Sequence, residues 1–86
     1  MVQNLCSLSA LSPGQRARVE RLRMEGPMRR RLLDLGLTGG TEVYCLGRSP
    51  GGDPTAYLIR GAVVALRRGD CENIAVRDVA GGGLWD

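Results

Sequence analysis

Turn-forming residues interrupt this chain roughly every eight to twelve positions, and that spacing limits what it can fold into. Thirteen glycines and four prolines make up about a fifth of its 86 residues. Because glycine and proline favour turns, the composition favours short strands over long helices. A chain of this length forms one small domain with a small core.

The segments between the turns are short and apolar, and several alternate as half-buried strands do. In the stretch 41–47, Val43 and Cys45 point one way while Tyr44 and Leu46 point the other. Short strands in so small a chain avoid exposed edges best by closing into a barrel. The sequence therefore predicts a mainly β fold, a small SH3-like barrel of about five strands, over residues 15–23, 41–47, 55–60, 62–67 and 74–78.

One helix is predicted between the first and second of these strands, at about residues 27–35. Pro27 suits the first helical position, and Met28, Leu32 and Leu35 follow at helical spacing. Gly36 suits the left-handed position that ends a helix. A helix this short does not hold alone in water, so its leucine face must pack on the barrel.

The remaining segments are predicted from shorter patterns. Leucines three apart in residues 5–11 favour a single turn of helix or 3₁₀ structure, and residues 68–73 have room for one 3₁₀ turn. The glycine-rich end, residues 80–86, is predicted to be a flexible tail. Residues 1–79 would then form the single domain.

Two residue types with wide chemical use are absent. The chain has no His and no Lys, and all twelve basic residues are Arg. This excludes a Ser-His-Asp triad, imidazole metal ligands, Schiff-base chemistry and a P-loop lysine. We therefore expect a protein that is not an enzyme and has no resident cofactor.

Positive charge is concentrated in the first part of the chain. The net charge is +3, yet residues 1–35 carry seven Arg against three acidic residues. Arg29, Arg30 and Arg31 fall in the first turn of the predicted helix, where the helix dipole favours anions. An acidic residue on the barrel or the carboxylates of a partner would compensate the charge of these arginines. A third interpretation is that they form a solvated face without a partner. Nucleic acid is disfavoured because no aromatic residue interleaves with the basic run.

The three cysteines do not form a disulfide or zinc pattern. Cys6, Cys45 and Cys71 are far apart, with no C-x-x-C spacing, which favours reduced thiols and a cytoplasmic protein. Asp70 and Glu72 flank Cys71 and should raise the pKa of its thiol. Together with Cys45 they are weak candidates for a transition-metal site, although their spacing matches no established ligand pattern. No stretch is long and apolar enough to span a membrane, and no signal peptide is expected.

Four motifs then resemble one known family. Residues 29–43 read Arg-Arg-Arg-Leu-Leu-Asp-Leu-Gly-Leu-Thr-Gly-Gly-Thr-Glu-Val. They are similar to the arginine-leucine-x-x-leucine-glycine pattern of the ferrous iron transport protein A (FeoA) family. Residues 11–17, 52–61 and 65–76 resemble the opening, middle and closing motifs of the family, in the same order. The resemblance covers residues 8–78; it departs at Gly39, where the family often has proline.

The resemblance implies a function as well as a fold. Such proteins are small SH3-like barrels without known catalytic activity, with a regulatory role in bacterial ferrous iron uptake. The implied partner is ferrous iron transport protein B, a membrane permease with a cytoplasmic GTP-binding domain. A similar barrel ends the iron-dependent repressors, but this chain lacks their helix-turn-helix part.

These observations lead to one favoured function and two alternatives. The favoured function is an adaptor in the cytoplasm, or at the inner membrane face through the transporter, with Arg29, Arg30, Arg31, Gly36 and Leu37 as the candidate partner-binding residues. The first alternative is a metal-responsive module using Cys45, Asp70, Cys71 and Glu72. The second is a small nucleic-acid-binding barrel. The sequence leaves self-association open.

Overall fold

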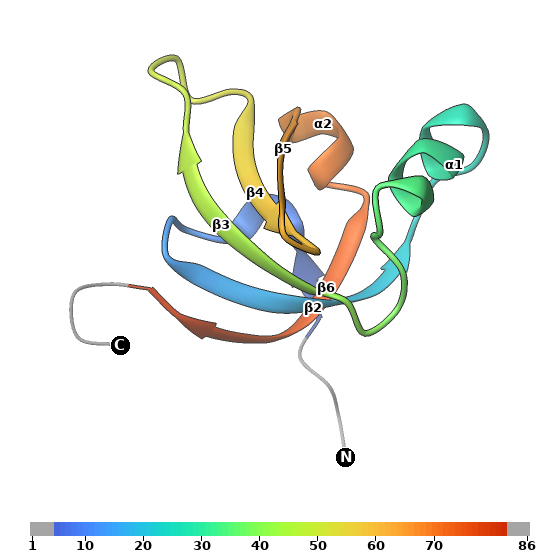
Figure 1. The fold of residues 1–86 in the computed structure, drawn as a ribbon, viewed down its shortest axis with the longest axis horizontal. Coiled ribbons are helices and arrows are strands. Elements are labelled where there is room, and N and C mark those ends of the chain that lie inside the picture. Colours follow the sequence, from blue (N-terminus) through green and yellow to red (C-terminus); the bar gives the residue numbers. More distant parts are fainter. Residues whose placement is uncertain (1–4, 83–86) are drawn as a thin grey trace.

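The computed structural model describes residues 5–82 and consists mainly of antiparallel strands (Figure 1). The strands are β1 (Cys6–Ser7), β2 (Gln15–Leu22), β3 (Glu42–Arg48), β4 (Thr55–Ile59), β5 (Ala62–Leu66) and β6 (Ile74–Gly81). Between them lie a 3₁₀ turn, η1 (Leu8–Ala10), and the helices α1 (Pro27–Asp34) and α2 (Arg68–Cys71). The mainly β fold with one helical insertion is confirmed.

The six strands form one sheet in the order β1-β6-β2-β3-β4-β5, in which every neighbouring pair is antiparallel. Figure 1 shows the sheet bent around itself into a small barrel, with α1 standing to one side and α2 between β5 and β6. The two edges of the sheet are β1 and β5.

The alternation seen in the sequence sets the inner and outer faces of the barrel. Val43 and Cys45 are buried, whereas the side chain of Leu46 is 46% exposed, as predicted. Cys45 lies opposite Tyr57 in the β3–β4 register, which places a buried tyrosine in the interior. The core is otherwise aliphatic and includes Leu8, Leu11, Val19, Leu32, Leu37, Ile59, Ile74 and Val76.

Three local predictions need correction. The sheet has six strands rather than five because Cys6 and Ser7 pair with β6. Strand β6 continues to Gly81 along β2, so the tail predicted over residues 80–86 is wrong for Ala80 and Gly81. Residues 83–86 of that predicted tail lie outside the described part of the chain. The turn after β5 is α-helical rather than 3₁₀.

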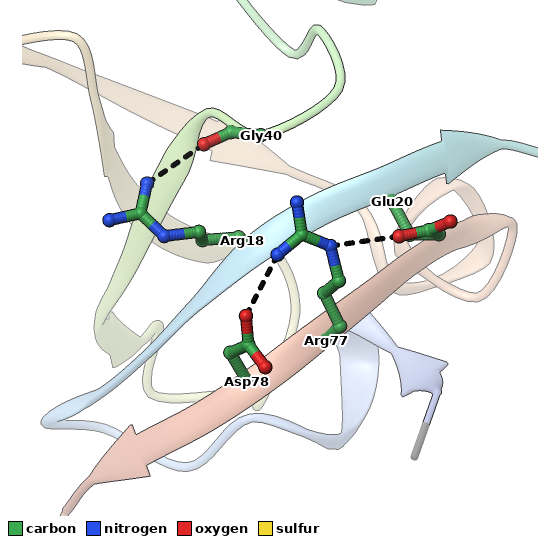
Figure 2. Close-up of polar contacts among 5 residues, drawn as sticks. All are labelled: Arg18, Glu20, Gly40, Arg77 and Asp78. Atoms are coloured by element: carbon green, nitrogen blue, oxygen red, sulfur yellow. Dashed lines mark hydrogen bonds and ion pairs between the residues drawn. The ribbon is translucent and has the colours of Figure 1, made fainter. Parts of the chain in front are cut away.

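Polar contacts tie β2 to β6 and to the segment after α1 (Figure 2). Arg77 on β6 places Nε 2.8 Å from Glu20 Oε1 and Nη1 2.8 Å from Asp78 Oδ2. Arg18 on β2 donates through Nη1 to the Gly40 carbonyl oxygen at 2.9 Å. The strand that precedes α1 and the loop that follows it are thereby held together.

Candidate docking surface

Helix α1 is short, and its two ends are set by backbone geometry. Gly26, at φ +81°, precedes Pro27 at the first position. At the other end the Leu35 amide donates to the Arg31 carbonyl at 3.0 Å, and Gly36 takes φ +104°. Both predicted ends are therefore confirmed, and α1 presents a defined face rather than a frayed turn.

One face of α1 packs on the barrel and the other faces solvent. Leu32 is completely buried, while Met28 and Leu35 are partly buried against the core. This matches the predicted apolar face. Arg29, Arg30 and Arg31 are exposed and project, about 100° apart, around the rest of the helix surface, so packing of the leucine face determines where their charge lies.

Leu37 and Gly36 do not belong to the exposed face. Leu37 is fully buried in the core, so its proposed role as a partner-binding residue is wrong for the folded chain. A Cβ on Gly36 would lie 2.5 Å from Cδ of Arg60, so this position is filled by the arginine side chain. Both residues help to fix the position of α1, and Gly36 is only partly buried.

Arg60 anchors the segment that follows α1. Its Nε donates to the Gly36 carbonyl at 3.2 Å, and its Nη2 donates to the hydroxyls of Thr38 at 3.2 Å and Thr41 at 3.3 Å. Sequence reasoning missed this arginine. The available signal was the pair Arg60-Gly61 between two strands, which is the length of a tight hairpin turn.

The arginines of α1 carry charge that the rest of the fold leaves unpaired. Arg29, Arg30 and Arg31 are exposed, and the first turn of α1 holds no acidic residue. Across residues 5–82, none of the three forms an ion pair. The barrel carboxylate considered from the sequence is therefore not found within this range. Their side chains remain available to acidic groups of another molecule.

A shallow hollow runs beside these arginines. It is lined by Glu25, Gly26, Arg29, Arg30, Leu33 and Asp34. A partner that enters it would meet guanidinium groups, two carboxylates and one apolar side chain. Such a mixed surface suits a protein partner, which can present acidic groups to the arginines and other groups to Glu25 and Asp34.

The structure does not bring the candidate metal ligands together. Cys45 and Cys71 are buried, whereas Glu72 is exposed and lies 3.8 Å from Nε of Arg68. In the part of the chain that the structure describes, no three Cys, Asp or Glu side chains are placed to hold a metal ion. The cluster inferred from sequence neighbours is thus not a ligand set in one copy of the chain.

The buried thiols are instead part of the core around Tyr57. Burial raises the pKa of Cys45 and of Cys71; for Cys71 a hydrogen bond from Tyr57 opposes this, while Asp70 adds to it. Burial also raises the pKa of Tyr57, with a contribution from Cys71. The predicted rise at Cys71 is confirmed, but burial rather than acidic neighbours is its largest cause. Both Tyr57 and Cys71 border a cavity of about 190 Å³.

All three cysteines are free thiols. In residues 5–82, no helix is both long enough and apolar enough to cross a membrane.

Comparison with known proteins gives a consistent family. A model of the FeoA domain family matches residues 6–78. A FeoA protein from Chlorobium tepidum is 39% identical, with 90% of this chain and 73% of that one aligned at a TM-score of 0.80. A FeoA-like protein from Clostridium acetobutylicum is 32% identical over 88% of this chain and 87% of that one, at a TM-score of 0.78.

Two further similarities bear on fold and metal. FeoA from Stenotrophomonas maltophilia in complex with zinc is described as an SH3-domain protein and a candidate ferrous iron transport activating factor. It is 30% identical over 81% of this chain and 87% of that one, at a TM-score of 0.71. A manganese-dependent transcriptional repressor, 21% identical over 92% of this chain and 43% of that one at a TM-score of 0.79, shares the fold. Among curated proteins the comparison found no match.

Proposed function

Since the chain belongs to the FeoA family, which is linked to ferrous iron transport, we propose that it is an accessory protein of bacterial ferrous iron uptake that binds the cytoplasmic GTP-binding part of the ferrous iron transporter. The family is a small accessory domain family and not a known enzyme. The chain itself has neither His nor Lys, which agrees with a role in binding rather than catalysis.

One observation carries the choice of surface. Arg29, Arg30 and Arg31 are exposed on a helix that the core holds in place, and none is paired within the described residues. Arg29 and Arg30 lie near the start of α1, where positive charge opposes the helix dipole and costs stability in the free protein, whereas Arg31 lies in its last turn. An acidic surface of a partner would reverse that cost and would speed the encounter.

The anchoring of α1 supports a preorganised surface. Arg60 and Arg18 hold the segment after the helix through four hydrogen bonds, and Leu32 fixes its inner face. A surface that is already ordered loses less conformational entropy on binding. Gly36 and Leu37 act in this role, as positioning residues behind the arginines.

Calorimetric titration of the full chain into the purified cytoplasmic domain of the transporter tests the proposal. We expect saturable binding at low ionic strength that weakens as salt is added, because screened surface charges contribute less. Failure to bind at low salt would remove the proposal. The contribution of the arginines is then tested by the charge-reversal comparison that closes the Discussion.

A transition-metal role is the alternative, raised by the zinc complex of the relative from Stenotrophomonas maltophilia. Within residues 5–82 of one chain, the candidate metal ligands do not form a site, since Cys45 and Cys71 are buried and no third ligand joins them. We therefore propose no resident metal. The cytoplasmic location, at the membrane through the transporter, follows from the proposed partner.

A further inference from the structure

Strand β5 is an edge of the sheet and carries no charge of its own. It pairs with β4 on one side, and the strand order ends there. Its five residues read Ala-Val-Val-Ala-Leu. Natural proteins usually protect an edge with lysine, proline or a bulge, because an unprotected edge accepts another strand. None of these devices is present in β5.

The hairpin geometry shows which backbone groups are free. The two-residue turn of Arg60 and Gly61 has φ of +49° and +80°, and it joins the paired residues Ile59 and Ala62. In such a hairpin the pair of residues next to the turn is hydrogen-bonded, and from there hydrogen-bonded pairs alternate with pairs that are not hydrogen-bonded. Val63 and Ala65 therefore direct their N–H and C=O groups away from β4, and no hydrogen bond from another described element reaches them.

The outer face beside this edge is apolar. Leu58 lies opposite Val63, whose side chain is 68% exposed, and Ala56 lies opposite Ala65. The small side chains of Ala56 and Ala65 leave a hollow that Leu46 and Pro54 also line. A strand added to β5 would place alternate side chains next to this apolar face.

Unpaired positive charge stands at both ends of β5. Arg60 is the first residue of the turn that leads into the strand, and its guanidinium donates to neutral oxygen atoms. Arg67 directly follows the strand and is exposed. Neither forms an ion pair with another residue of the described range.

From these observations we propose that β5 is a second binding surface, which accepts by strand addition an extended peptide segment of another protein. Apolar residues of that segment would alternate along Val63 and Ala65, and acidic residues would flank them. A five-residue strand spans about 17 Å, so acidic residues about six positions apart would reach both arginines. This surface is separate from that of α1.

Charge argues for such a peptide over a second copy of this chain. Two β5 strands paired antiparallel about Val64 would bring Arg60, in the turn of one copy, towards Arg68, at the start of α2 in the other. Like charges brought together at both ends of the pairing are unfavourable. An acidic segment instead meets complementary charge at each end.

Fluorescence polarisation with a defined probe tests the proposal on the full chain. The probe is a labelled, end-capped peptide, Glu-Val-Thr-Val-Thr-Val-Glu. We expect saturable binding at low ionic strength. A matched peptide with Lys for both Glu should bind at least about tenfold more weakly. A version with alternate amides N-methylated should not bind, since strand addition needs those donors.

Variants of the chain locate the site. Val63→Pro removes the outward N–H at an edge position where proline is tolerated, and should abolish binding, whereas Val63→Ala should weaken it less than about threefold. Arg67→Glu, a surface change that keeps the backbone intact, should weaken it about three- to tenfold. Reversal of the charges of Arg29, Arg30 and Arg31 should leave peptide binding unchanged, which separates this surface from the one proposed above.

Three results would overturn the proposal. The first is equal binding of the N-methylated peptide, and the second is equal binding by folded Val63→Pro and Arg67→Glu chains. The third comes from sedimentation of the chain alone: a dimer that Val63→Pro dissociates would make a second copy, and not an acidic peptide, the occupant of this edge.

Discussion

The side chain of Arg60 occupies the space that a Cβ on Gly36 would need. An ideal Cβ there would lie 2.5 Å from Cδ and 2.9 Å from Nε of Arg60, while Nε donates to the Gly36 carbonyl at 3.2 Å. This contact holds the turn between β4 and β5 against the end of α1. The position of the exposed arginines thus depends on a contact between segments about 24 residues apart in sequence.

We expect Gly36→Ala to destabilise the fold by about 3 kcal/mol. A side chain at φ +104° is strained, and the added methyl group must displace Arg60. Urea unfolding followed by circular dichroism measures the change. Gly69→Ala is the matched control, because Gly69 lies in α2 with open space around it; its stability should stay constant or rise by up to about 1 kcal/mol.

A second substitution separates the two causes. In an Arg60→Gly background the arginine no longer fills the site, so Gly36→Ala should cost less, by about 1 kcal/mol or more. If Gly36→Ala lowers the free energy of unfolding equally in both backgrounds, the contact with Arg60 contributes nothing to the loss, and backbone strain alone explains it.

The pair of Glu20 and Arg77 should contribute more to stability than a surface ion pair. Its atoms lie 2.8 Å apart and its side chains are only about a quarter exposed, whereas Arg16 and Glu42 are 3.8 Å apart and 45% and 41% exposed. Double-mutant cycles with Gln replacements, measured by urea unfolding, should give a clear coupling for the first pair and almost none for the second. The reverse order would contradict the geometry in Figure 2.

The helix ends and the strand faces could be predicted because their signals are local. Pro27 and Gly36 bound α1, and the alternation of Val43 and Cys45 sets the inner face of β3. The strand β1, the end of β6 and the burial of Leu37 could not, because each depends on pairing or packing with a distant segment. The run of Arg29, Arg30 and Arg31 could also be predicted, because its residues are adjacent in the sequence. The contact of Arg60 with the segment after α1 could not, because it joins distant segments.

The cysteines should differ sharply in reactivity. Cys45 and Cys71 are 1% exposed, and burial raises the pKa of both thiols, so neither presents a thiolate at neutral pH. Cys6 is only partly buried. Mass spectrometry after brief treatment with N-ethylmaleimide near pH 7.5 should find the label on Cys6, and on all three thiols only in urea. Rapid labelling of Cys71 in the folded protein would contradict this burial.

Stability should fall in alkaline solution. The folded state keeps Cys45, Cys71 and Tyr57 protonated above their ordinary pKa values of 9.0 for the thiols and 10.0 for the phenol. The unfolded chain then binds fewer protons, so the free energy of unfolding decreases as pH rises. Below about pH 8 this contribution is fully present. Urea unfolding at about pH 7, 9 and 10.5 measures it, and a constant value across that range would contradict the prediction.

Removal of one thiol provides the control for that pH dependence. Cys45→Ala is less stable at every pH because it leaves a cavity, by about 1 to 2 kcal/mol. Its stability should nevertheless fall less steeply above pH 9, since one of the three protonated groups is absent. An unchanged slope would assign the alkaline loss to other groups.

The central claim is that the arginines of α1 bind the transporter, and one comparison tests it most directly. The cytoplasmic domain of the transporter is titrated with the wild-type chain, with Arg29→Glu/Arg30→Glu/Arg31→Glu, and with Arg21→Glu/Arg23→Glu/Arg68→Glu. All six arginines are exposed, and the two variants carry the same change in net charge. We predict that only the first variant loses binding, by about tenfold or more at low salt, while both stay folded. Equal affinity of the wild type and the α1 variant, or equal loss in both variants, would contradict the claim.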